Sequence, residues 1–126
     1  MRYLWIFLGG GAGAVARYAL GGWILRLTGS AFPWGTLAVN ALGSLLLGAL
    51  MHLALATDAI APELRIALAA GLLGGFTTYS SFNYETIEIL REGSWAMAAA
   101  NIGLTVLLCL AAGFAGLAAA RWLAGN

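Results

Sequence analysis

At the centre of the chain stands Gly74-Gly75-Phe76-Thr77-Thr78-Tyr79-Ser80-Ser81-Phe82. It interrupts a hydrophobic segment, Ile66 to Tyr84, that contains no charged residue. A glycine pair followed by five successive hydroxyl-bearing residues makes a poor surface against lipid. In hydrocarbon every backbone polar group needs a partner, so irregular backbone there must be buried in protein or line a cavity. Arg65 and Arg91 bracket the segment with Thr78 midway between them, so the stretch predicts a helix broken near mid-membrane.

Such a break has two interpretations. Broken helices at mid-membrane commonly bind ions, because one half-helix offers carbonyl groups and the other offers amides. Alternatively, the Gly74-Gly75 pair only kinks the helix to improve its packing, since membrane helices tolerate glycine well. Spacing alone leaves both interpretations open.

The composition is that of an integral membrane protein. Of 126 residues, 62% are hydrophobic and 9% are charged, against about 25% charged in a soluble domain. The net charge is +1, so no basic face for nucleic acid is expected. Cys109 and His52 are each the only residue of their type. We therefore expect no intrachain disulfide, no His/Cys metal site and no catalytic nucleophile–base pair.

Four membrane spans are expected, each long enough to cross roughly 30 Å of hydrocarbon. They run from about Tyr3 to Leu27, Pro33 to Thr57, Pro62 to Leu90 and Ser94 to Arg121. The connections are short, so residues 1–126 should form a single four-helix transmembrane domain. The fold class is therefore an all-α, multi-pass membrane protein with a broken third helix, placed in the cell (inner) membrane.

Two spans contain polar residues spaced four apart, which places them on one helix face. These are Thr36, Asn40, Ser44 and Gly48 in the second span, and Asn101, Thr105 and Cys109 in the fourth. Polar residues can also hold helices together or bond to their own helix. Two stripes that each contain an intramembrane asparagine favour a polar path.

Further polar residues lie in the first and third spans. Arg17 is deep in the first span, where a charge is costly unless it meets water, a carbonyl or a partner acid. It either caps a neighbouring helix or lies beside an aqueous vestibule that attracts anions. After the break, helical spacing groups Tyr79, Phe82 and Asn83 with Glu85 or Thr86 on one side.

The arginines show almost no bias between the two membrane faces. The end with both termini and the second loop has Arg2, Arg65 and Arg121, and the opposite end has Arg26 and Arg91. Under the positive-inside rule such a chain could insert both ways round. Pairing with an inverted copy would then give the inverted symmetry of larger transporters. The two broken helices would meet at the two-fold axis.

Three motifs, in this order and spacing, resemble the Fluc (CrcB) family of small fluoride channels over essentially the whole chain. They are Gly10-Gly11-Ala12-Gly13-Ala14-Val15-Ala16-Arg17-Tyr18, Gly35-Thr36-Leu37-Ala38-Val39-Asn40, and the central stretch followed by Glu85-Thr86. The resemblance implies a passive fluoride channel that is an antiparallel, dual-topology homodimer in the lipid bilayer. It also implies two fluoride pores and one central, structural sodium ion per dimer.

The resemblance also implies roles for individual residues. Backbone carbonyls of Gly74 and Thr77 would hold the sodium ion. The expected anion pathway comprises Thr36, Asn40, Tyr79, Ser81, Phe82, Glu85, Asn101 and Thr105, with Arg17 as a vestibule charge. Tyr79 stands where the family usually has phenylalanine, and Cys109, at the end of the polar track, is a weaker donor than serine.

The residue chemistry fits fluoride. A pore must replace the water around this small, tightly hydrated ion with amide or hydroxyl donors and the positive edges of aromatic rings. The residues alone indicate only a path for a small anion or polar solute. The alternative is a small dual-topology multidrug exporter, which needs a deep carboxylate, typically in the first span. This chain has Arg17 there instead.

Overall fold

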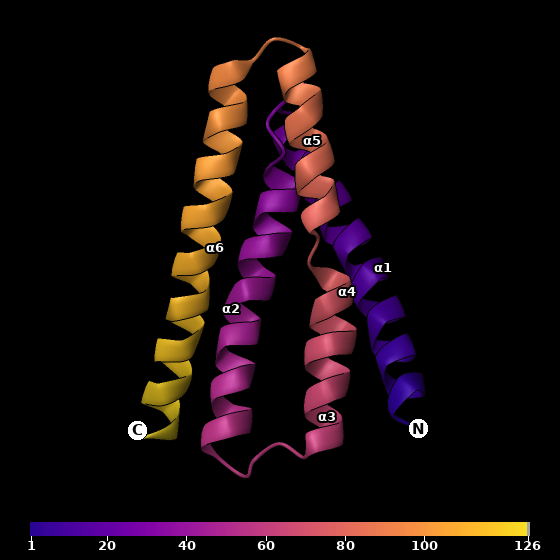
Figure 1. Ribbon diagram of the computed structural model, residues 1–126, viewed down its shortest axis with the longest axis vertical. Helices are drawn as coiled ribbons and strands as arrows, with labels where there is room; N and C mark the ends of the chain where they lie inside the picture. Colours follow the sequence, from indigo (N-terminus) through magenta and orange to yellow (C-terminus); the bar gives the residue numbers. More distant parts are fainter. Residues whose placement is uncertain (126) are drawn as a thin grey trace.

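A computed structural model describes residues 1–125, and every regular element in that range is helical (Figure 1). Three long helices are α1 (Arg2–Thr28), α2 (Trp34–Ala56) and α6 (Trp95–Ala124). Between α2 and α6 the chain forms α3 (Pro62–Ile66), the π-helical segment η1 (Ala67–Leu73), α4 (Gly74–Phe76) and α5 (Tyr79–Arg91). The four expected helical segments are confirmed, although α6 continues three residues beyond the expected end at Arg121.

Glycine and proline mark the ends of these segments. Gly29 ends α1 in the left-handed conformation, with φ 53°, and Pro33 directly precedes α2. Pro62 opens α3, where its missing amide hydrogen costs nothing. Gly93, with φ 82°, turns the chain between α5 and α6. The connections are therefore as short as the sequence indicates.

The elements run alternately up and down, so both termini and the α2–α3 connection lie at one end (Figure 1). Helix α2 packs mainly on α6, and α1 packs on η1 and α4. Glycines allow these approaches: Gly13 lies against the Leu72 carbonyl, and Gly75 lies against Gly10. A Cβ atom at either position would collide with backbone.

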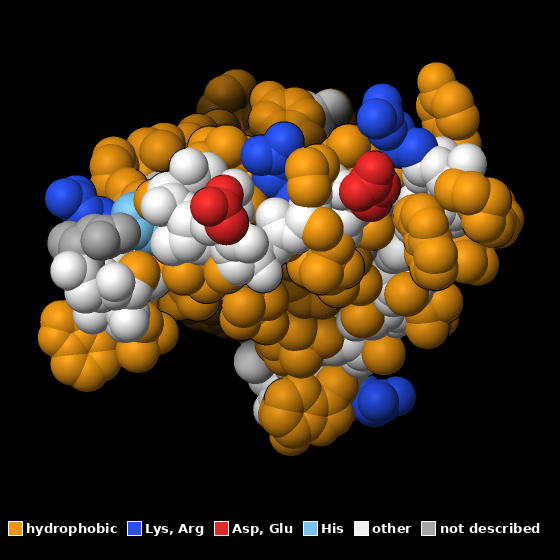
Figure 2. All heavy atoms as spheres, turned by 90° about the horizontal axis from the view of Figure 1, so that it is seen from below, with side chains coloured by type: hydrophobic (Ala, Val, Ile, Leu, Met, Phe, Trp, Pro, Cys, Tyr) orange, Lys and Arg blue, Asp and Glu red, His pale blue; other side chains and the backbone are white. Residues whose placement is uncertain are grey.

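The outside of the bundle is apolar, with few charged side chains in the end view (Figure 2). Leu107 and Phe114 on α6 are 68% and 69% exposed. Helices α2 and α6 are each long and apolar enough to cross a membrane, while α1 carries Arg17 and the third segment is broken. So extensive an apolar surface is that of a membrane protein.

Candidate functional site

The expected break in the third helix is confirmed. Helix α4 ends at Phe76, and Thr77 and Thr78 have extended backbone before α5 begins at Tyr79. Thr78 is the N-cap of α5, and its hydroxyl accepts from the Ser81 amide at 3.2 Å. The hydroxyl-rich run therefore begins a new half-helix.

Asn40 on α2 holds the break in place. Its Oδ1 accepts from the Thr78 amide at 2.7 Å, and its Nδ2 donates to the Thr78 carbonyl at 2.9 Å. The side chain replaces helical partners that Thr78 lacks, and its second amide hydrogen remains available. One turn further on, Gly43 lies against the Thr77 side chain, with no room for a Cβ atom. Sequence reasoning missed Gly43, whose only signal is its place beside the polar stripe.

Arg17 reaches the break from α1. Its Nε donates to the Gly75 carbonyl at 3.1 Å. In a continuous helix the amide of Tyr79 would bind this carbonyl, but the break removes that partner. Of the two alternatives for Arg17, the structure shows capping of a neighbouring helix directly. The same guanidinium also lines a cavity.

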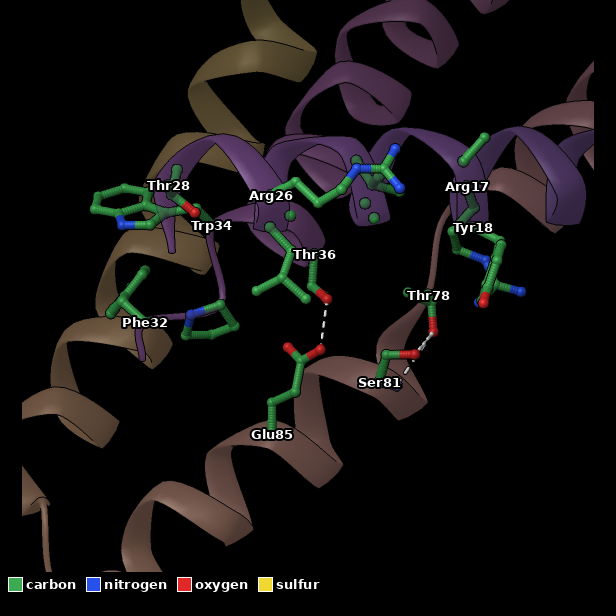
Figure 3. A pocket seen from close by; sticks show the side chains of 17 residues that line it. Arg17, Tyr18, Arg26, Thr28, Phe32, Trp34, Thr36, Thr78, Ser81 and Glu85 are labelled. Atoms are coloured by element: carbon green, nitrogen blue, oxygen red, sulfur yellow. Dashed lines mark hydrogen bonds between the residues drawn. The ribbon is translucent and has the colours of Figure 1, made fainter. Parts of the chain in front are cut away.

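That cavity, which we call the arginine cavity, has a volume of about 450 Å³ (Figure 3). Its polar lining comes from α1, α2, the break and α5, and includes Arg17, Arg26, Thr28, Thr36, Thr78, Ser81 and Glu85. The Thr36 hydroxyl donates to Glu85 Oε1 at 2.7 Å. The other carboxylate oxygen of Glu85 is buried, with no hydrogen-bond partner in the part of the chain that the structure describes.

A second hollow, the aromatic groove, lies on the other side of the break, between α2, α5 and α6. It has a volume of about 480 Å³, and its lining includes Asn40, Thr77, Thr78, Tyr79, Phe82 and Thr105. The rings of Tyr79 and Phe82 have centroids 5.7 Å apart and planes tilted by 59°. Thr78 lines both hollows, so they adjoin at the break.

The structure thus divides the expected anion-path residues between the two hollows, except for Asn101. Thr36, Ser81 and Glu85 line the arginine cavity, and Asn40, Tyr79, Phe82 and Thr105 line the aromatic groove. Glu85 does not share a face with Tyr79 and Phe82, because it turns toward Thr36. Asn101 lies on neither hollow: it is 1% exposed and donates to Thr86 Oγ1 at 2.9 Å. It links α5 to α6, and its part in a path stays a prediction.

Among the carbonyls that the break leaves without helical partners are those of Gly74 and Thr77. The amides that would bind Gly74 and Thr77 belong to Thr78 and Ser81. These amides bind Asn40 Oδ1 and Thr78 Oγ1 instead. Within residues 1–125 no group of three acidic, histidine or cysteine side chains could hold a metal ion. A cation at this point would therefore depend on backbone oxygens.

The comparisons with known proteins cover nearly the whole chain. The family model described as "CrcB-like protein, Camphor Resistance (CrcB)" matches residues 4–117. Proteins named "Fluoride-specific ion channel FluC" are similar: that of Sorangium cellulosum is 52% identical over 122 residues, 97% of this chain and 96% of the relative. That of Anaeromyxobacter dehalogenans is 53% identical over 124 residues, 98% of each chain. That of Geobacter sulfurreducens is 50% identical over 114 residues, 90% of this chain and 92% of the relative.

Proposed function

This chain belongs to the CrcB-like family, and from that membership we propose that it is a passive channel through which fluoride leaves the cell across the inner membrane. Its relatives are named fluoride-specific ion channels, and such channels are not enzymes. Nothing favours the exporter alternative, because the polar group deep in α1 is Arg17, bonded to the Gly75 carbonyl.

The feature of the structure that supports the proposal is the lining of the aromatic groove. In this lining the Thr105 hydroxyl already donates to Asn101 Oδ1 at 3.5 Å. The lining also includes Asn40, which keeps a second amide hydrogen, and the aromatic rings of Tyr79 and Phe82, whose edges are electropositive. These groups can replace water around a small anion. The lining contains no charged side chain, so a bound anion is not held too tightly to leave.

The arginine cavity would be the entrance to this groove. Arg17 and Arg26 place two positive charges on its wall, against one carboxylate, Glu85. An excess of one sign in a low-dielectric cleft raises the local concentration of the opposite ion. Thr78 lines both hollows, so the cavity and the groove adjoin at the capped break.

We assign the working form to an inverted dimer. Tyr79 is 79% exposed in the single chain, although it follows the break at mid-helix, and Gly74 is exposed as well. A second copy in the opposite orientation would cover both and add its own aromatic rings to each of two pores. The near-even arginine distribution supports insertion in both orientations.

A sodium ion fits the same interface. The carbonyls of Gly74 and Thr77 lack helical donors, and two inverted copies would bring two such pairs together. Carbonyl oxygens are suitable ligands for an alkali cation, as selectivity filters show. When bound, the ion would be coordinated by these carbonyl oxygens and would hold the two breaks together, and it would not be transported.

Efflux from liposomes that contain the purified protein tests the proposal. Vesicles loaded with fluoride should release it without any proton gradient, and vesicles loaded with chloride should not release chloride. Equal release of the two anions would contradict a fluoride-selective channel. No fluoride release from vesicles with intact, folded protein would contradict the channel itself.

A further inference from the structure

A third hollow follows the aromatic groove along α2 and α6, and we call it the distal groove. It has a volume of about 670 Å³. Ser44 and Cys109 line both grooves, and Ser44 is one helical turn from Asn40, which binds the break. At the other end the lining includes Leu55 and Ala56, where α2 stops. The distal groove therefore runs from the middle of the bundle to one of its ends.

The length of the distal groove matches one leaflet of a membrane. Ser44 and Ala56 are twelve residues apart on α2. At about 1.5 Å per residue, this interval is about 18 Å long. Half of the hydrocarbon layer of a bilayer is about 15 Å thick. An acyl chain that enters from the nearer membrane surface would therefore extend along the whole groove.

The lining of the distal groove suits such a chain. It consists mainly of apolar side chains from both helices, namely Leu47, Met51, Leu55, Leu110, Phe114 and Leu117. The Ser44 hydroxyl already donates to the Asn40 carbonyl at 2.7 Å, and the His52 Nε2 atom is buried. The surface that the groove offers is therefore mainly hydrocarbon.

The outer end of the groove leads to a positive charge. Another hollow shares Phe114 and Leu117 with the distal groove and is lined also by Arg121 and Trp122. Arg121 lies in the last turns of α6, at the end of the bundle where both termini are found (Figure 1). Trp122 is 79% exposed. Tryptophan is enriched at the level of the lipid head groups, and arginine near a helix end extends its charge to that level.

Arg121 has no acidic partner in the part of the chain that the structure describes. The one ion pair within residues 1–125 joins Arg91 and Glu88, at the opposite end of the bundle. Asp58 and Glu63, the acids at the end of Arg121, line neither of these two hollows. The phosphate of a lipid whose chain lies in the groove would supply the missing negative charge.

We propose that the distal groove binds one anionic phospholipid, with an acyl chain between α2 and α6 and the phosphate group on Arg121. Gly74 and Tyr79, where we place the contact with a second copy, are outside the lining of the groove. Their position favours lipid over a helix of the second copy as the occupant. The inference needs only that the helices lie in a bilayer, so it does not depend on fluoride conduction.

Native mass spectrometry of the purified protein, incubated with lipid in detergent, counts the bound molecules. Phosphatidylglycerol and phosphatidylcholine with the same acyl chains are the probes. One arginine near a membrane surface favours anionic lipid about fivefold, so phosphatidylglycerol should bind about fivefold more tightly, at one site per chain. Arg121→Gln should abolish this preference. Arg2→Gln is the control: it removes the same charge at the same end, from an exposed position outside both hollows, and should keep the preference.

A second variant tests the groove itself. Leu117 lines both hollows where they join, and Leu117→Trp adds bulk there without changing the charge. It should weaken the binding of both lipids, whereas Arg121→Gln should weaken only that of phosphatidylglycerol. If Leu117→Trp does not fold, the comparison of Arg121→Gln with Arg2→Gln decides alone.

Three results would overturn the proposal. The first is equal binding of the two lipids to the unmodified protein. The second is a preference for phosphatidylglycerol that survives Arg121→Gln. The third is a folded Leu117→Trp protein that elutes as a monomer on size exclusion where the unmodified protein elutes as a dimer, because the second copy would then occupy the groove.

Discussion

Replacing Asn40 by aspartate changes one functional group at the centre of the site. The side chain keeps its size and can still accept from the Thr78 amide through one oxygen, as Asn40 does at 2.7 Å. The other oxygen then faces the Thr78 carbonyl, to which Asn40 Nδ2 donates at 2.9 Å. Losing that bond and leaving the carbonyl unpaired should cost about 1–3 kcal/mol of folding free energy.

The effect on conduction should be larger than the effect on stability. A negative charge about 4 Å from a passing anion repels it by about 4 kcal/mol at an effective dielectric constant of about 20. Since about 1.4 kcal/mol corresponds to a factor of ten, fluoride flux should fall about a thousandfold. The aromatic groove has no positive side chain that would offset this repulsion.

The assay is fluoride efflux from liposomes, followed with a fluoride electrode at matched protein content. Thermal unfolding in detergent measures the loss of folding free energy separately. Leu42→Ala is the matched control, because Leu42 lies on α2, is 41% exposed and lines no hollow described above. If Asn40→Asp conducts within a few-fold of the unmodified protein while remaining folded, the anion does not pass Asn40, and the reasoning is refuted.

Three other predictions follow from the same geometry. Phe82→Ile keeps apolar bulk but removes the electropositive ring edge, so it should slow fluoride efflux steeply while size-exclusion chromatography still shows the dimer. Tyr79→Phe should slow efflux only mildly. If Tyr79→Phe is the more damaging of the two, the tyrosine hydroxyl is the ligand. Arg17→Met leaves the Gly75 carbonyl uncapped and should lower the free energy of unfolding by about 1–3 kcal/mol, measured by denaturation; unchanged stability would show that the bond contributes nothing. Replacing sodium by a larger organic cation should weaken the dimer and the flux, and no change in either would exclude a structural ion at Gly74 and Thr77.

The helix break was predictable because its signal is local. Gly74-Gly75 and the hydroxyl run are adjacent in sequence, and the half-helix that follows begins with a threonine N-cap, a common local motif. The partners of the break were not predictable in this way. Asn40 and Thr78 are 38 residues apart, and Arg17 and Gly75 are 58 apart, so only the packing of α1 and α2 brings them together.

Periodicity also could not distinguish a groove from a helix contact. Asn101 and Thr105 share one stripe, yet Asn101 is buried against Thr86 while Thr105 lines the aromatic groove. Periodicity also could not predict that Glu85 turns toward Thr36. Helix α5 is short and has polar residues on several faces, so its sequence does not indicate which face meets α2. The π-helical segment η1 has no sequence signal beyond an apolar, alanine-rich run.

The central claim, passive and selective fluoride conduction, is tested most directly by electrical recording from the purified protein in a planar bilayer. With fluoride at unequal concentrations on the two sides, and chloride replacing it on the dilute side, the account predicts a current that reverses close to the fluoride equilibrium potential. A reversal potential set equally by both anions, or the absence of any current from folded protein, would contradict it.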